Sequence, residues 1–165
     1  MSDPYGEIWI GTEGAGLLRW NQITGKAELP YGQSETSAGM TLNNVTSILA
    51  DSRGTIWSFG TDYFCRFNQA ENKIVNYRFL YDHQTVYENP GSSVTVDQSF
   101  RLSDGKIWFF SREEGLIYKF DPSSEKLVLY RTPTFAAFQC LPDNQETLWF
   151  ACVRYNVFRM IWKQI

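Results

Sequence analysis

Short apolar and β-branched runs alternate along the chain with turns rich in Gly, Asp, Ser and Asn. The clearest series begins after Asn44 and reads "VTSILA", the turn "DSRG", "TIWSFGT", the tight turn "DY", "FCRFN", the turn "QAEN" and "KIVNY". Runs of about four to eight such residues bounded by turns are typical of β-strands joined as hairpins, and no segment has a helical period. We therefore expect four short antiparallel strands in this series and almost no helix.

The series repeats along the chain. A second complete copy reads "SVTVDQSFRL", "SDG", "KIWFFS", "REEG", "LIYKFD", "PSSE" and "KLVLY", and shorter copies lie near both ends. The tryptophans at 9, 57, 108 and 149 are 48, 51 and 41 residues apart. Periods of about 40 to 50 residues are typical of propeller blades.

The predicted fold is therefore all-β, a β-propeller fragment of about three and a half four-stranded antiparallel blades in one segment, 1–165. The predicted units are a partial blade at 1–31, full blades at 44–77 and 94–130, and a partial blade at 135–165. The first unit lacks its opening strand, and the last one stops before a clear fourth strand.

The second strand of each full unit is apolar on both faces, as in Ile56, Trp57 and Phe59 or in the run 107–110. A strand with one solvated face alternates apolar and polar residues, so this strand must be covered on both sides. Blades stacked face to face provide that cover. We expect Trp57 and Trp108 to be buried between blades.

Composition and charge exclude several classes of partner. The net charge is −3, the sequence pI is about 5.2, and no basic stripe is interleaved with aromatic residues, which argues against nucleic-acid binding. No apolar run reaches the roughly 20 residues that cross a bilayer, so no direct membrane contact is expected in this segment. The start "MSDPYGE" is not typical of a signal peptide. Cys65, Cys140 and Cys152 lie in apolar runs and are expected to be buried thiols.

No catalytic signature is present. The glycines of "GTEGAG" have the order G-x-x-G-x-G and open no helix, which excludes the dinucleotide fingerprint. His83 is the single histidine, so neither a histidine-rich metal site nor a histidine-based hydrolase triad with a second histidine in reserve is predicted. Asp62, Glu113 and Glu114 occupy candidate loops, where solvated side chains are commoner than a converging catalytic pair. The predicted catalytic residues, metal ligands and cofactors are therefore none.

Candidate ligand contacts come from blade topology. The loop between the second and third strands opens on the same face as the connection to the next blade. Aromatic side chains that stack and arginines that form paired hydrogen bonds are the candidates on this face. They are Tyr63, Tyr81, His83, Tyr87, Arg112, Arg154 and Tyr155. For any one of them, a loop residue that only packs on its neighbours is the commoner alternative.

The stretch "EIWIGTEGAGLLRWNQITGKAELPY" resembles the two-component regulator propeller repeat, [LI]WIGT-x-x-GL-x-R-[FW]-[DN]-x-x-TGK. It has one residue more between Thr12 and Gly16, and the matching positions are Trp9, Gly11, Thr12, Gly16, Leu17, Arg19, Trp20, Asn21, Thr24 and Gly25. "LNNVTSILADSRGTIW" is equally typical of that family. Later units depart from the pattern: Ser58 and Phe59, Phe110 and Ser111, and Ala151 and Cys152 replace its Ile-Gly or Gly-Thr pairs.

The resemblance implies the periplasmic sensor region of a hybrid two-component histidine kinase of Bacteroidetes such as Bacteroides. It implies a non-enzymatic segment of a membrane-anchored protein that carries the kinase elsewhere. Such sensors often respond to glycan breakdown products, which implies an oligosaccharide ligand. Two alternatives stay open: a fragment of a propeller enzyme, either a lyase or a glycosidase, and a scaffold for protein interactions.

An arc of this size leaves blade faces uncovered at both ends, which favours self-association. Trp9 and Ile10 lie on the strand at one end, and Trp149 and Phe150 on the strand at the other. We expect a dimer or larger assembly at micromolar concentration, in which each end meets the opposite end of the other molecule.

Overall fold

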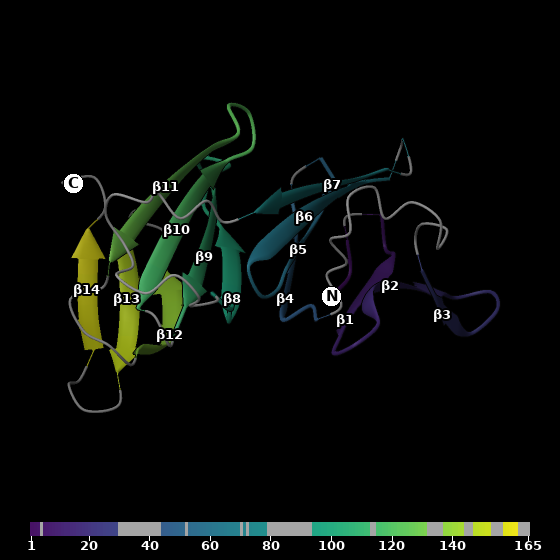
Figure 1. Ribbon diagram of the computed structural model, residues 1–165, viewed down its shortest axis with the longest axis horizontal. Helices are drawn as coiled ribbons and strands as arrows, with labels where there is room; N and C mark the ends of the chain where they lie inside the picture. Colours follow the sequence, from purple (N-terminus) through teal and green to yellow (C-terminus); the bar gives the residue numbers. More distant parts are fainter. Residues whose placement is uncertain are drawn as a thin grey trace. The chain divides into compact units, whose positions relative to one another are not determined.

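The computed structural model shows an all-β chain, in which the described residues form β-strands and no helix (Figure 1). The described residues are 1–3, 5–29, 44–51, 53–69, 71, 73–78, 94–112, 115–131, 137–143, 147–152 and 157–161. The chain divides into two compact units, Met1–Thr95 and Val96–Ile165. Each unit contains two antiparallel sheets.

The first unit contains a three-stranded and a four-stranded sheet. The three-stranded sheet is formed by β1 (Ile8–Thr12), β2 (Gly16–Asn21) and β3 (Lys26–Glu28). The four-stranded sheet is formed by β4 (Ser47–Ala50), β5 (Ile56–Phe59), β6 (Tyr63–Asn68) and β7 (Lys73–Arg78). Spatial order follows chain order in both sheets, as expected for strands joined by hairpin turns.

The second unit contains a four-stranded and a three-stranded sheet. The former consists of β8 (Gln98–Arg101), β9 (Ile107–Ser111), β10 (Leu116–Asp121) and β11 (Lys126–Arg131). The latter consists of β12 (Ala137–Pro142), β13 (Thr147–Cys152) and β14 (Val157–Ile161). Every residue of β5 and of β9 is buried, which confirms that these second strands are covered on both faces.

Tryptophan joins the two sheets of the first unit. Trp9 on β1 packs with Ile56 and Phe67 of the next sheet, and the Trp9 and Phe67 ring centres lie 5.3 Å apart. Val45, just before β4, belongs to the same buried cluster. The core of this unit therefore lies between the two sheets.

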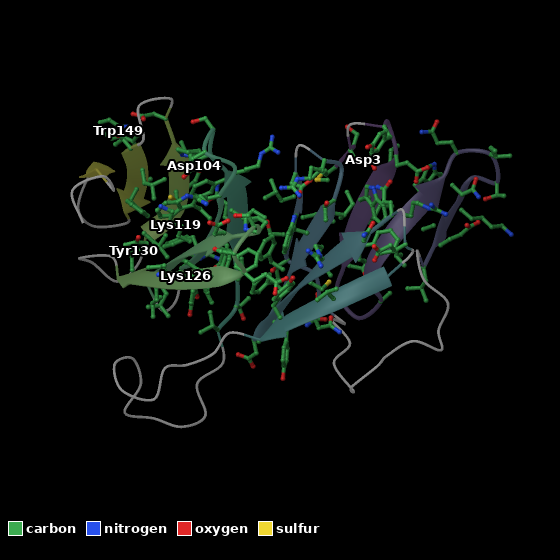
Figure 2. All side chains as sticks on the ribbon, turned by 90° about the horizontal axis from the view of Figure 1, so that it is seen from above. Asp3, Asp104, Lys119, Lys126, Tyr130 and Trp149 are labelled. Carbon is green, nitrogen blue, oxygen red and sulfur yellow. The ribbon has the colours of Figure 1, made fainter. Side chains whose placement is uncertain are left out.

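The second unit repeats this arrangement with Trp108 on β9. Trp108 is fully buried in a cluster with Cys140 and Leu148 of the following sheet. On its own sheet, Tyr130 stacks on the Trp108 ring at 5.7 Å, and the Lys119 Nζ lies 5.3 Å from the ring centre. Figure 2 labels Lys119, which lies on β10, and Tyr130, which lies on β11. The predicted burial of Trp57 and Trp108 is confirmed.

The first sheet has a short pairing at the edge where an opening strand would lie. Met1 and Ser2 run antiparallel to β1: the Trp9 backbone N–H donates to the Met1 carbonyl oxygen at 2.8 Å, and Ser2 bridges Ile8. The sequence did not predict this pairing, because three residues carry no strand pattern.

The first and last sheets each have one buried and one exposed side chain at neighbouring positions of the strand that carries the tryptophan. Trp9 and Phe150 are buried, whereas Ile8 and Trp149 are exposed. Successive residues of a strand point to opposite faces of the sheet. Of the residues named on the two end strands, Trp9 and Phe150 are therefore buried and Trp149 is exposed, and self-association stays a prediction.

Candidate functional site

An aspartate six residues before the tryptophan organises the turn between the first and second strands. In the second repeat, Asp51 Oδ1 accepts hydrogen bonds from the backbone N–H groups of Arg53 and Thr55, at 2.8 and 3.0 Å. Its Oδ2 accepts one from Trp57 Nε1 at 3.2 Å. The carboxylate thus fixes both the turn backbone and the indole ring, because charged acceptors form strong hydrogen bonds.

The same Asp–Trp pair recurs in the first and last repeats. Asp3 Oδ2 accepts from Trp9 Nε1 at 3.0 Å, and Asp143 Oδ2 accepts from Trp149 Nε1 at 2.9 Å. In the third repeat this position is Leu102, which cannot accept a hydrogen bond from Trp108 and packs against the buried cluster instead. This pair was not predicted from the sequence, although the spacing D-x5-W is visible in three of the four repeats.

Asp3 has one partner more, from the neighbouring repeat. Gln69 Nε2 donates to Asp3 Oδ2 at 2.7 Å, and the backbone N–H groups of Tyr5 and Glu7 donate to Oδ1. Burial disfavours the charged carboxylate, but the hydrogen bonds from Trp9, Gln69 and the backbone outweigh it. The pKa of Asp3 is therefore lowered.

The turn after Asp3 presents Tyr5, whose side chain is 70% exposed. Its ring lies against Gly54 of the next repeat: a Cβ atom on Gly54 would come within 2.3 Å of Tyr5 Cε2. Gly54 also has a φ of +77°, which favours glycine. The Tyr5 hydroxyl donates to the Arg53 carbonyl oxygen at 3.4 Å. The tyrosine is thus seated on the neighbouring turn with part of its ring open to solvent.

Tyr5 lines two of the hollows on the first unit. One, of about 390 Å³, is lined by Tyr5, Arg53, Gly54, Thr55, Asn68 and Gln69. The other, of about 340 Å³, is lined by Tyr5, Gly6, Glu7, Arg19, Trp20, Asn21, Gln22 and Ile23. Aromatic rings beside amide and charged groups can stack on a ring-shaped ligand and hydrogen-bond its hydroxyl groups. These hollows are the candidate ligand site among the described residues.

Tyr63, one of the predicted ligand residues, begins β6 and so lies at the end of its sheet away from the turns that line the hollows. Neighbouring strands run antiparallel, so the turns that line the hollows lie opposite the loops between second and third strands. In those loops Glu13 bridges Asn44, and Thr61 bridges Thr95, so each contacts the segment that leads into the next repeat. This agrees with the predicted shared face.

Tyr63 and Arg112 are the predicted ligand residues that the structure describes. Tyr63 begins β6 and is half-buried, and Asp62 before it accepts a hydrogen bond from the Val94 N–H at 2.8 Å. The Arg112 guanidinium pairs with Asp97 Oδ1 at 3.1 Å, so its paired donors already have one acceptor within the protein. The other predicted positions, Tyr81, His83, Tyr87, Arg154 and Tyr155, lie outside the described residues.

Nucleophile and metal chemistry find little support in the described part of the chain. Cys65 and Cys140 are buried free thiols, as predicted. Burial raises the pKa of Cys65 to about 11 and that of Cys140 to about 12, which suppresses the reactive thiolate. No group of three or more His, Cys, Asp or Glu side chains among these residues could hold a metal ion. No helix there is long and apolar enough to cross a membrane.

Solved structures with the same fold include both sensor and enzyme domains. The extracellular domain of BT4673 from B. thetaiotaomicron, described as a one-component system, matches 96% of this chain with a TM-score of 0.67 and 16% identity. A second structure of BT4673, described as a hybrid two-component system, matches 99% with a TM-score of 0.51 and 14% identity. Virginiamycin B lyase from Staphylococcus aureus matches 97% with a TM-score of 0.63 and 17% identity.

The WD40 repeats of RRP9 also match 93% of the chain, with a TM-score of 0.64 and 11% identity. WD40 repeats form propellers, so the fold is that of a β-propeller. The chain spans 20% of the first BT4673 structure, 28% of the second, 53% of the lyase and 44% of RRP9. No protein-family profile matches the chain, and neither does any curated protein.

Proposed function

We propose that the chain is a ligand-sensing propeller segment of a hybrid two-component sensor, located in the periplasm as part of a membrane-anchored protein. The observation that carries the proposal is the match of 96% of the chain to the extracellular domain of BT4673. The first repeat supports it independently, because "EIWIGTEGAGLLRWNQITGK" resembles the repeat typical of such sensors.

An oligosaccharide is the proposed ligand class. Sugars offer an apolar ring face for stacking and hydroxyl groups for hydrogen bonds, and the hollows beside Tyr5 offer complementary groups. Tyr5 supplies the aromatic surface, and Arg53 and Gln69 supply donors at the edge of the larger hollow. The alternative position is the loop end that contains Tyr63 and Arg112.

Calorimetric titration of the full chain with a panel of neutral and acidic oligosaccharides tests the proposal. We expect one class to bind, and Tyr5→Ala to weaken binding by about tenfold or more, as expected for loss of a stacking contact of about 1.4 kcal/mol. Tyr63→Ala is the matched variant at the opposite end and should leave the affinity unchanged. The reverse pattern would place the ligand at the loop end, and no binding by any sugar would contradict a glycan ligand.

The second candidate function is that of a lyase, because the fold also matches virginiamycin B lyase. Mass spectrometry of the same oligosaccharides after prolonged incubation separates the two functions. A sensor returns the ligand unchanged, whereas a lyase or glycosidase yields smaller products. Product formation that scales with protein concentration would overturn the non-enzymatic proposal.

A further inference from the structure

The larger hollow lies between two consecutive repeats of the first unit. The first repeat contributes Tyr5, from the turn before β1. The second repeat contributes the other lining residues, which are Arg53, Gly54, Thr55, Asn68 and Gln69. Both walls of this hollow therefore belong to one compact unit, and the side chains on both walls are described.

Tyr5 and Arg53 occupy the same position of the repeated turn. Each stands two residues after the aspartate that accepts the indole hydrogen bond, and each directly precedes a glycine. In the third repeat this position is Asp104, whose Oδ1 accepts a hydrogen bond from the Lys106 N–H at 3.0 Å. Figure 2 labels Asp104, on the turn between β8 and β9. The turn itself is thus compatible with an aromatic, a positive or a negative side chain at this position.

The turn of the second repeat uses the backbone of Arg53 and not its side chain. The Arg53 N–H donates to Asp51 Oδ1 at 2.8 Å, and its carbonyl oxygen accepts from the Tyr5 hydroxyl at 3.4 Å. Arg53 is exposed, and its guanidinium forms no ion pair with any residue that the structure describes. Beside the smaller hollow, by contrast, Arg19 pairs with Glu7 at 3.4 Å. The larger hollow therefore has a positive charge that the described part of the protein does not neutralise.

The carboxylates close to this hollow in sequence face other partners. None of the described residues that line it is an aspartate or a glutamate. The carboxylates of Asp3 and Asp51 accept hydrogen bonds from the indoles of Trp9 and Trp57 and from turn N–H groups. Glu71 is exposed and does not line the hollow. An aromatic ring and a guanidinium are thus the distinctive groups at the larger hollow.

We propose that the oligosaccharide bound in the larger hollow is anionic, with its carboxylate or sulfate group on Arg53 and a sugar ring on Tyr5. This inference rests on the proposed function, because it assumes that a sugar occupies the hollow. The planar guanidinium presents paired N–H donors that match two oxygens of a carboxylate or a sulfate. A neutral sugar offers only uncharged acceptors, which form weaker hydrogen bonds. Arg53 is therefore the residue that determines the charge of the ligand.

Ligand pairs that differ only in charge test the proposal. Calorimetric titration of the full chain compares trigalacturonic acid with its methyl ester, and a sulfated galacto-oligosaccharide with its desulfated form. In one of the two pairs, we expect the acidic member to bind about tenfold or more tightly than the neutral member. The pair that shows this preference identifies the anionic group. Added salt should weaken binding of the acidic member alone, because salt screens an exposed ion pair.

Substitutions of Arg53 assign the preference to its side chain. Arg53→Gln should abolish the preference for the acidic member, and Arg53→Lys should retain part of it, because lysine keeps the charge but not the paired donors. Arg53→Asp should prevent binding of the acidic member, and the third repeat shows that aspartate fits the turn. Circular dichroism verifies the fold of each variant. Arg101→Gln is the matched control, because it removes the same charge from an exposed residue of β8 that lines neither hollow.

The outcomes separate this inference from the proposed function. If acidic and neutral members bind equally well and Tyr5→Ala weakens both, the ligand is a sugar but the anionic ligand is wrong. If Arg101→Gln loses the preference as fully as Arg53→Gln does, the charge of the whole chain and not the hollow selects the ligand, which also overturns the proposal. Binding by none of the four compounds would overturn it as well, and the neutral sugars of the wider panel would then decide whether the chain binds a glycan.

Discussion

Trp108 and Trp149 occupy equivalent strands, yet Trp108 is fully buried and Trp149 is 37% exposed. The local turn does not explain the difference, because the exposed Trp149 has the hydrogen bond from its indole to Asp143, whereas Leu102 takes the aspartate position before the buried Trp108. What Trp108 has in addition is the following sheet, with Cys140 and Leu148 against it. The aspartate therefore orders the turn, and the neighbouring repeat buries the ring.

The largest predicted effect comes from the two tryptophans themselves. Trp108→Ala removes a ring packed between sheets and should lower the free energy of unfolding by about 3–5 kcal/mol. Trp149→Ala removes a partly exposed ring and should cost about 1 kcal/mol or less. Urea denaturation of both variants at concentrations below self-association measures the difference. If both variants lost the same free energy of unfolding, packing against the following sheet would not determine how much each tryptophan stabilises the fold.

The aspartates provide the next comparison. Asp51→Ala leaves the Trp57 indole and two backbone N–H groups without their acceptor in a partly buried turn, and should cost about 1–3 kcal/mol. Asp143→Ala breaks a solvent-exposed bond to Trp149 and should cost less than about 1 kcal/mol. Urea midpoints check this order. A larger loss of stability for Asp143→Ala than for Asp51→Ala would show that burial of the hydrogen bond does not determine its contribution to stability.

The sequence predicted those parts of the fold that depend on short-range pattern. The apolar runs around Trp57 and Trp108 predicted covered strands, since a strand with both faces apolar has few other solutions. The pattern did not distinguish the two faces of the end strands: Trp9 and Phe150 are buried, whereas Trp149, which was named beside Phe150, is exposed. Strand alternation shows that neighbouring residues face opposite sides, but it does not show which side the next repeat covers.

The candidate site was much harder to predict. The hollows beside Tyr5 exist because the ring rests on Gly54, which belongs to another repeat. Nothing in the local sequence around Tyr5 indicates that contact. The Asp–Trp pair could have been predicted as a recurring motif, because D-x5-W is repeated in the sequence. The hydrogen bond itself depends on a turn geometry that brings the carboxylate back to the indole.

Substitutions at two equivalent glycines test the packing of the Tyr5 ring against Gly54. Gly54 and Gly105 occupy the same turn position, with φ angles of +77° and +78°. Gly105→Ala meets nothing within 4 Å and should cost about 1 kcal/mol for the left-handed backbone alone. Gly54→Ala must also displace the Tyr5 ring, so it should cost more and should weaken ligand binding at the hollows. Thermal denaturation and calorimetric titration measure the two effects, and identical stability losses would contradict the seating of Tyr5.

The smallest predicted effect is the pH dependence due to Asp3. Its pKa is lowered in the folded chain, so its ionised form stabilises the fold at pH values above the unfolded pKa, near 3.8. This contribution is lost as the pH falls below that value and through the lowered folded pKa. Protonation leaves an oxygen that can still accept weaker hydrogen bonds, so the loss should be smaller than that caused by removing the side chain.

Comparison of the unmodified chain with Asp3→Asn isolates this contribution, because asparagine keeps the shape and one acceptor oxygen but does not titrate in this range. The stability difference between the two proteins, measured by urea denaturation from pH 6 to pH 2.5, should be constant above about pH 5 and shrink below about pH 4. The third repeat has Leu102 at this position and contributes no such titration, so the change reports on the Asp3–Trp9 turn and its Gln69 partner. A difference that grows as the pH falls would mean that the folded pKa of Asp3 is raised, and that burial outweighs the hydrogen bonds.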